Sequence, residues 1–283
     1  MRWIGRRESG NVEDRRGMGS GTLIGGGIGT VVIAIIVYLL GGDPSQVLNT
    51  APDSPTQQVT GTNPEEDKTA KFVRVVLADT EDVWTKLLAE RGQQYQKPIL
   101  VLFRQQTQSA CGTASSASGP FYCPGDAKLY IDLSFFDEMR ERLQSPGDFA
   151  MAYVIAHEVG HHIQHQMGTI DKVDGMRGGL SRVENNRVSV RLELQADFLA
   201  GVWAHHNQEM NQALEAGDIE EAMGAANAIG DDRLQQQTQG HVVPDAFTHG
   251  TSAQRVYWFK KGYETGDITQ GDTFTSREDA NLQ

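Results

Sequence analysis

The sequence has few cysteines, no cluster of basic residues beyond its N-terminus, and no internal repeat. Cys111 and Cys123 are the only cysteines among 283 residues, and their spacing matches no Cys-x-x-Cys pattern, which argues against a cysteine-ligated zinc site. Two alternatives stay open for this pair: a disulfide in an exported domain, or reduced thiols in the cytosol. The formal net charge is −12, and phosphate binding requires clustered Lys and Arg, so no nucleic-acid partner is expected.

Charged side chains are missing altogether from residues 18–42. The apolar centre of this run, Leu23–Leu40, approaches the ~20 residues that a transmembrane helix needs. Arginines outnumber acids before the run and acids dominate after it, so the positive-inside rule places the N-terminus in the cytoplasm and the rest outside. The length of the run and the lack of an Ala-x-Ala site favour an uncleaved anchor over the alternative, a cleaved signal peptide.

Large apolar residues are nearly absent from residues 43–69, which are rich in Pro, Thr, Gln, Asp and Asn. Such a segment cannot bury enough surface to fold and is predicted to be a disordered linker. The expected organisation is a basic cytoplasmic segment (1–17), a transmembrane anchor (18–42), this linker (43–69) and a folded domain (70–283).

The folded domain is predicted to be α+β, helix-rich with a small mixed sheet packed on one side. Apolar spacing predicts helices over 71–91, 146–167, 183–205, 218–239 and 251–264, with another beginning near Ser134. Short apolar runs predict strands over 98–103 and 128–133. The second of these contains "KLYID", which is interpreted either as an exposed edge that binds substrate or as an ordinary core strand.

The stretch "AHEVGHHIQ", residues 156–164, places three histidines and a glutamate on a predicted apolar helix. His157 and His161 are four residues apart, so they lie one turn above the other on the same side and can grip one zinc ion. Glu158 lies beside them and can reach a metal-bound water without being a ligand. This is the His-Glu-x-x-His arrangement of zinc proteases.

Zinc requires a third protein ligand. One class of zinc proteases uses a histidine six residues after the second His, but Met167 occupies that position here. His165 is expected to lie too far along the axis, and His162 to cap or to face solvent. "RLELQADFLAG" supplies Glu193 as the ligand and, four residues later, Asp197 as the acceptor that orients a ligand histidine. Glu184 is the alternative ligand.

These residues predict that Glu158 acts as general base toward a zinc-bound water and then passes the proton to the leaving amine. An additional donor is expected to stabilise the oxyanion, and His249 in "THGTSAQR" is the candidate. The alternative is that His249 merely precedes a helix capped by Thr251 or Ser252.

From Ala70 onward, the chain resembles the bacterial neutral zinc metallopeptidase family. The segments that carry the resemblance are "SACGTASSASGPFYCPGDAKLYIDLSFF", "VIAHEVGHHIQHQMG", "RLELQADFLAGVWAHH" and "HGTSAQRVYWFKKGYETG". The resemblance implies an N-terminal anchor, a zincin-like domain, zinc at His157 and His161 with Glu193 as third ligand, and Glu158 as the catalytic residue. It also implies a Cys111–Cys123 disulfide, which in a short loop contributes about 3 kcal/mol.

The sequence thus predicts a single-pass, membrane-anchored zinc endopeptidase that cleaves peptides or proteins in the periplasm or outside the cell. A zinc-stabilised extracytoplasmic scaffold or binding protein without turnover is the alternative. A third interpretation is membrane-bound interaction through the linker. Glu158 favours the enzyme, because a site that only binds metal has no need of a base beside the ligands. The sequence predicts no oligomeric state.

Overall fold

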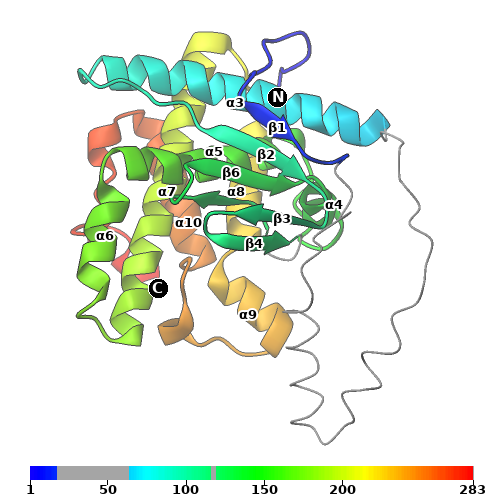
Figure 1. Ribbon diagram of the computed structural model, residues 1–283. Coiled ribbons are helices and arrows are strands. Elements are labelled where there is room, and N and C mark those ends of the chain that lie inside the picture. The colour runs from blue at the N-terminus through cyan, green and yellow to red at the C-terminus, as the bar shows by residue number, and fades with distance from the viewer. Residues whose placement is uncertain (18–63, 116–118, 283) are drawn as a thin grey trace, which may run out of the picture. The chain divides into compact units, whose positions relative to one another are not determined.

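The computed structural model describes residues 1–17, 64–115 and 119–282 (Figure 1). The chain divides into two compact units, one made of Met1–Arg15 with Asn63–Gln283 and the other of Arg16–Thr62. The helices and strands named below belong to the first unit. The expected anchor over 18–42 and residues 43–63 of the expected linker lie outside the described residues, whereas residues 64–69 begin a helix. Within the described ranges, no helix combines the length and apolar character that crossing a membrane requires.

A four-stranded mixed sheet lies in the middle of this unit, in the order β1-β2-β6-β5 (Figure 1). Its strands are β1 (Val12–Asp14), β2 (Ile99–Phe103), β5 (Phe121–Cys123) and β6 (Lys128–Asp132). β1, β2 and β6 run parallel, whereas β5 is antiparallel to β6 and forms the edge. "KLYID" is therefore a core strand. A separate hairpin joins β3 (Gln106–Ser109) and β4 (Gly112–Ser115).

Helices make up most of the unit, so the prediction of a helix-rich α+β domain with a small mixed sheet is confirmed. The helices are α3 (Pro64–Ala89), α4 (Ser134–Glu141), α5 (Asp148–Gln166), α6 (Thr169–Arg177), α7 (Arg182–Asn211), α8 (Asp218–Ala228), α9 (Asp231–Gln239) and α10 (Ser252–Thr265). Three short 3-10 turns cover Pro244–Ala246, Ile268–Gln270 and Ala280–Leu282.

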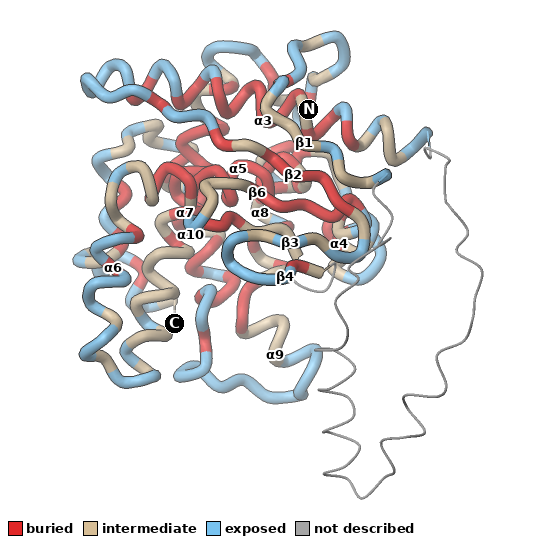
Figure 2. The backbone as a smooth tube through the Cα atoms, in the orientation of Figure 1, coloured by how far each residue is buried: buried red, intermediate tan, exposed pale blue. Residues whose placement is uncertain are grey.

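The central helix is α5, which is buried on nearly all sides (Figure 2). α3, α7 and α8 pack around it, and its apolar side chains Phe149, Ile155, Val159 and Ile163 are fully inaccessible.

α7 and α10 approach closely. A Cβ on Gly262 would lie 2.0 Å from the Phe198 carbonyl oxygen, so only glycine fits at this crossing. Such close packing fixes the position of α10 relative to α7.

The N-terminal segment packs into the same unit as the site helices. β1 pairs with β2, the ring of Trp3 meets that of Phe72 edge-on at 5.4 Å, and Arg6 Nη2 lies 2.7 Å from Asp79 Oδ1. The structure therefore differs from the expected division, in which residues 1–17 formed a separate segment.

Several boundaries also differ from those expected. α3 begins at Pro64 instead of near residue 70, with acids in its first turn that complement the helix dipole. The helix expected over 218–239 is interrupted at Gly230, where a Cβ would lie 2.4 Å from the Ser252 amide nitrogen. The β3–β4 hairpin, β5 and α6 have no counterpart among the expected elements. These segments are too short, or too rich in polar residues, to show a helical or strand period.

Candidate active site

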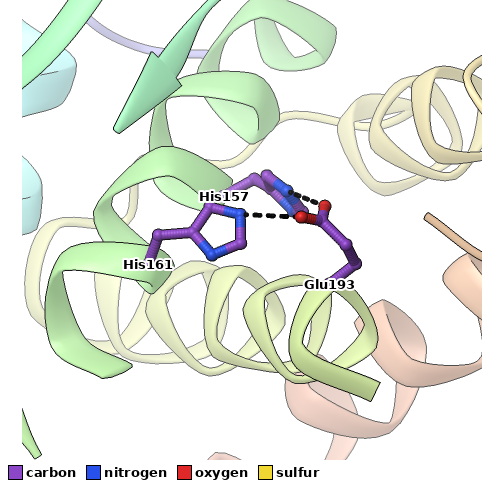
Figure 3. Close-up of side chains that lie close together, drawn as sticks. All are labelled: His157, His161 and Glu193. Carbon is purple, nitrogen blue, oxygen red and sulfur yellow. Dashed lines mark hydrogen bonds and ion pairs between the residues drawn. The ribbon is translucent and has the colours of Figure 1, made fainter. Parts of the chain in front are cut away.

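His157, His161 and Glu193 converge from two helices (Figure 3). Both histidines project from α5, and Glu193 reaches them from α7. His157 Nε2 lies 3.2 Å from Glu193 Oε2, and His161 Nε2 lies 3.4 Å from Glu193 Oε1. The structure thus brings together the three residues that the sequence analysis proposed as metal ligands.

Gly160 allows α7 to come this close to α5. A Cβ on Gly160 would lie 2.9 Å from the Ala196 carbonyl oxygen, a distance that real Cβ atoms almost never show, and 3.1 Å from the Ala196 Cα, which is also unusually tight. The glycine inside the His-Glu-x-x-His motif therefore brings the α7 backbone, with Glu193 one turn away, against the histidine pair.

Asp197 and Gln164 hold the two imidazole rings through their other nitrogens. His157 Nδ1 lies 2.8 Å from Asp197 Oδ1, and His161 Nδ1 lies 2.8 Å from Gln164 Oε1. Gln164 is itself fixed, because its amide nitrogen donates to the Leu192 carbonyl at 2.7 Å. Since each of these oxygens accepts, each Nδ1 donates a proton to it, which leaves each Nε2, on the side of Glu193, as the ring atom available to a metal ion.

Arg255 from α10 and Tyr153 from α5 hold Asp197. Arg255 donates through Nε and Nη2 to the two carboxylate oxygens at 2.9 and 3.0 Å, and the Tyr153 hydroxyl donates at 2.5 Å. Asp197 is wholly buried and Arg255 is 2% exposed. The sequence analysis predicted Asp197 but missed Arg255, Tyr153 and Gln164. An arginine among the apolar residues of α10 was the one available signal, since a buried guanidinium requires a partner.

The charges of the cluster favour a bound cation. Burial alone would raise the pKa of Glu193, but the two histidines outweigh it, and the pKa of this carboxyl lies well below its ordinary value. Burial alone would lower the pKa of His157, but Asp197 and Glu193 raise it above its ordinary value. Anionic Glu193 and Asp197 thus favour positive charge at the point where the histidine lone pairs meet.

A cavity of about 520 Å³ opens onto this cluster. Its lining includes five residues that the sequence analysis assigned to the site: His157, Glu158, His161, Glu193 and His249. The edge strand β5 contributes Phe121 and Tyr122. Glu158 is 7% exposed, and burial raises the pKa of its carboxyl above the ordinary value although the two histidines oppose this. A carboxyl whose pKa is raised in this way is suited to accept and release a proton.

His249 reaches the cavity from the loop before α10. Its Nδ1 lies 3.1 Å from Asp231 Oδ1, and its side chain is half exposed. The hydrogen bond from His249 to Asp231 raises the pKa of the imidazole above its ordinary value. The other carboxylate oxygen of Asp231 accepts the backbone N–H groups of Thr248, His249 and Gly250, which fixes the loop. Thr251 caps α10 through a capping box, so the expected capping role falls to Thr251.

The other candidate ligands lie elsewhere. His162 was expected to cap a helix or to face solvent, but it is buried, with 5% of its surface exposed. It and His165 share the Tyr122 hydroxyl, at 3.1 and 2.8 Å from their Nδ1 atoms. Glu184 caps the start of α7 with Ser181. Neither histidine nor Glu184 belongs to the cluster with Glu193.

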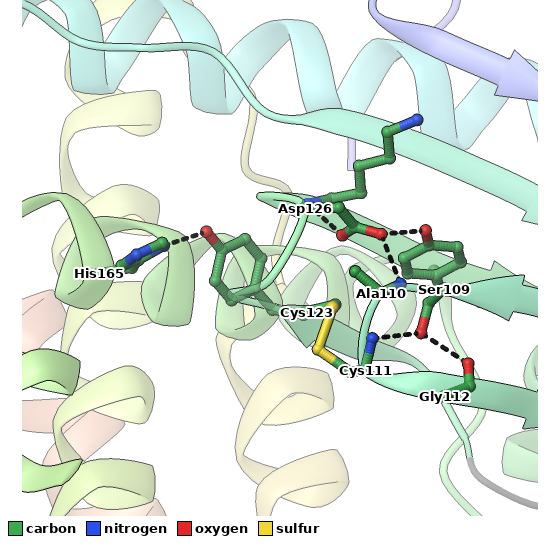
Figure 4. Close-up of a disulfide and its surroundings, with 10 residues drawn as sticks. Ser109, Ala110, Cys111, Gly112, Cys123, Asp126 and His165 are labelled. Atoms are coloured by element: carbon green, nitrogen blue, oxygen red, sulfur yellow. Dashed lines mark hydrogen bonds between the residues drawn. A yellow bond between two sulfur atoms is a disulfide. The ribbon is translucent and has the colours of Figure 1, made fainter.

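The two cysteines form a disulfide that joins the β3–β4 turn to β5 (Figure 4). Cys123 is fully buried, and Asp126 accepts hydrogen bonds from the Ala110 amide and the Tyr130 hydroxyl beside it. The cross-link therefore secures the strand that lines the cavity.

The cluster fits zinc by three tests. The donor set, two imidazoles and a carboxylate, is one that zinc uses in catalytic sites. Two ligand atoms on one tetrahedral zinc ion lie roughly 3.4 Å apart, given bonds near 2.1 Å, and the separations in the structure are 3.2 and 3.4 Å. In both imidazoles Nδ1 is hydrogen-bonded to a fixed acceptor, which leaves Nε2 free to bind a metal ion.

Paired histidines, a glutamate from a second helix and a buried glutamate in the same cavity define a candidate metal centre of the zinc peptidase class. Comparison with known families agrees with this geometry: the family model described as "Putative neutral zinc metallopeptidase" matches residues 1–274. The chain belongs to this family.

Its relatives include "Uncharacterized protein YpfJ" of Escherichia coli (strain K12), 50% identical over 97% of this chain and 99% of the relative. "Uncharacterized protein Rv2575" of Mycobacterium tuberculosis (strain ATCC 25618 / H37Rv) is 39% identical over 85% of each chain. No solved structure matches the chain.

Proposed function

We propose that this protein is a zinc-dependent endopeptidase in which His157, His161 and Glu193 hold the metal and Glu158 is the general base. The observation that supports this most directly is the shared cavity. It places Glu158 beside the three converging ligand atoms, with both histidine tautomers fixed for metal binding.

A zinc ion held by His157, His161 and Glu193 would lower the pKa of a bound water and would polarise the substrate carbonyl. Glu158 accepts the proton from the nucleophile and delivers it to the departing amine, a role suited to its raised pKa. Asp197 and Gln164 keep the imidazoles in position through their Nδ1 atoms, and Arg255 keeps Asp197 ionised and fixed. His249, held by Asp231 at the cavity wall, is proposed to donate to the developing oxyanion.

The substrate is proposed to be an extended peptide that adds to the free edge of β5. Among the described strands, only β6 pairs with β5, which leaves the other edge of β5 beside the cavity. Backbone hydrogen bonding along such an edge aligns a peptide with little dependence on its side chains.

For the location, we propose that the catalytic unit lies outside the cytoplasm and is attached to the membrane. The Cys111–Cys123 disulfide favours an oxidising compartment, and the uncharged run over 18–42 favours attachment. Because Met1–Arg15 pack into the catalytic unit, we propose that they share its compartment instead of the cytoplasm.

The test combines metal analysis with hydrolysis of a broad peptide library by the full chain, beside Glu158→Gln. The proposal expects one zinc ion at this site in both proteins and a loss of turnover of at least about 100-fold in the variant. Equal turnover in the two proteins would contradict Glu158 as the general base, and no turnover in either protein with zinc retained would favour a scaffold over an enzyme.

A further inference from the structure

A second group of metal-ligating side chains lies at the C-terminal end of α7. His205, His206 and Glu209 each offer one ligand atom, and these atoms lie within 4.8 Å of one another. None of the three lines the cavity at Glu193. The two histidines end the segment "RLELQADFLAGVWAHH", and the proposed peptidase mechanism makes no use of them.

Backbone carbonyls fix the tautomer of both rings. His205 Nδ1 lies 2.7 Å from the Tyr263 carbonyl oxygen, and His206 Nε2 lies 2.9 Å from that of Gly266. A carbonyl can only accept, so each of these nitrogens carries a proton. The remaining nitrogens both face Glu209: His205 Nε2 is 3.5 Å from Oε1, and His206 Nδ1 is 3.0 Å from Oε2.

This arrangement repeats the geometry of the first cluster. There, the histidine-to-glutamate separations are 3.2 and 3.4 Å, and the two imidazole centroids are 4.9 Å apart. The His205 and His206 centroids are also 4.9 Å apart. In both clusters every histidine gives one N–H to a fixed acceptor and turns its other nitrogen to a shared carboxylate, as metal-ligating histidines do.

The end of α10 is shaped to hold these rings. Gly266 has a left-handed φ of +62°, and a Cβ there would lie 2.5 Å from His205 Cδ2. The residue whose carbonyl fixes His206 is thus also the residue that leaves room for His205. A larger side chain at this position would displace the His205 ring.

We propose that His205, His206 and Glu209 bind a second divalent transition-metal ion, with Zn²⁺ as the expected ion because imidazole and carboxylate ligands suit it. His205 and His206 are partly buried, and Glu209 is 57% exposed, so water can complete the coordination. The ion fastens the end of α7 to the end of α10 through the two imidazole–carbonyl hydrogen bonds. Its role is structural.

The experiment measures zinc per full-length chain after metal removal, reloading with Zn²⁺ alone and dialysis. We expect two ions in the wild type, one in Glu209→Gln and one in Glu193→Gln. The double variant is expected to hold none. His241→Ala is the matched control: His241 is exposed, and its ring bonds only to the Gln239 carbonyl, so two ions should remain. His206→Ala is a second test of the site and should also hold one ion.

A single ion in the wild type that disappears in Glu193→Gln would overturn the proposal, as would two ions in both Glu209→Gln and His206→Ala. One ion retained by Glu193→Gln and lost on adding Glu209→Gln supports the second site even if the first site has no peptidase activity. Circular dichroism establishes that each variant is folded.

Discussion

Arg255 binds both carboxylate oxygens of Asp197 in the interior of the protein, and Asp197 in turn holds His157. Two residues 58 positions apart in the sequence thus determine how one imidazole is presented to the candidate metal site. Without Arg255, Asp197 would be a buried carboxylate with hydrogen bonds from Tyr153 and His157 but without its arginine counter-charge.

Replacing Asp197 by Asn is expected to weaken zinc binding by roughly 10–100-fold, because an amide supports the His157 N–H less strongly. The variant should also lose roughly 3–5 kcal/mol of stability, since the Arg255 guanidinium stays buried with its main partner gone. Competition with a chelator of known affinity, at a temperature where the variant is folded, measures the first effect. Asp174→Asn, a change at the cavity wall away from the ligands, should leave affinity unchanged.

Gly160→Ala is expected to separate α5 from α7, because the new methyl group would lie 2.9 Å from the Ala196 carbonyl oxygen. Overpacking of this kind costs roughly 1–3 kcal/mol, and any shift of α7 moves Glu193 away from the histidines. Urea unfolding and zinc titration check both effects. Gly175→Ala in α6, where a Cβ meets no atom within 4 Å, should be neutral or slightly stabilising. Equal behaviour of the two variants would contradict the importance of this helix contact.

Glu81 on α3 is expected to make docking of the N-terminal segment sensitive to acid. It is 1% exposed and accepts hydrogen bonds from Ser9, Asn11 and Arg7. Burial raises the pKa of this carboxyl, but these donors outweigh it, so its folded pKa lies below the ordinary value of 4.5. The stabilisation is therefore fully present above about pH 4.5 and is lost as the pH falls through the folded pKa.

Glu81→Gln should accordingly lower the free energy of unfolding by about 2–3 kcal/mol at pH 7, and by less as the pH falls below 4.5. Denaturant unfolding of both proteins from pH 7 to pH 3.5 measures this convergence. Glu8→Gln, at a more exposed site 3.7 Å from Lys71, is the control and should change little at any pH. A difference between wild type and Glu81→Gln that grows on acidification would contradict the account.

Cysteines placed at Ile4 and at Val242, both exposed, are expected to be labelled from the same side of the membrane. The native cysteines do not interfere, because they are joined in a disulfide. In intact cells, a membrane-impermeant maleimide should react with both positions or with neither. Labelling of one position alone, with the other reacting only after permeabilisation, would instead support a single crossing between residues 17 and 64.

The ligand pair and its base could be predicted from the sequence because one helical turn fixes the spacing of His157, Glu158 and His161. Glu193 and Asp197 could be predicted for a similar reason, since two acids four residues apart on an apolar helix need a partner. The structure brings Glu193 to the pair and Asp197 to His157.

Arg255 and Gln164 could not be predicted in the same way. The contact of Arg255 with Asp197 depends on how closely α10 crosses α7, which the glycine contacts at Gly201 and Gly262 determine. Gln164 matters because the Leu192 carbonyl turns its amide toward His161. Both contacts depend on how the helices pack against one another, and no periodicity or residue spacing in a single sequence predicts that packing.

β1 could not be predicted, because three residues between a polar stretch and two arginines do not show strand periodicity. Its pairing depends on β2, some 85 positions further on. The positive-inside rule counted the same arginines only as charges beside a candidate membrane anchor. The structure instead uses Arg6 and Arg7 in ion pairs with acids of α3.

The central claim is that two imidazoles from α5 and a carboxylate from α7 hold one metal ion. Anomalous diffraction at the zinc edge from crystals of the zinc-loaded protein tests it most directly. The account predicts a peak about 2.1 Å from His157 Nε2, His161 Nε2 and a carboxylate oxygen of Glu193. A zinc-loaded crystal with no peak between these three side chains would contradict it.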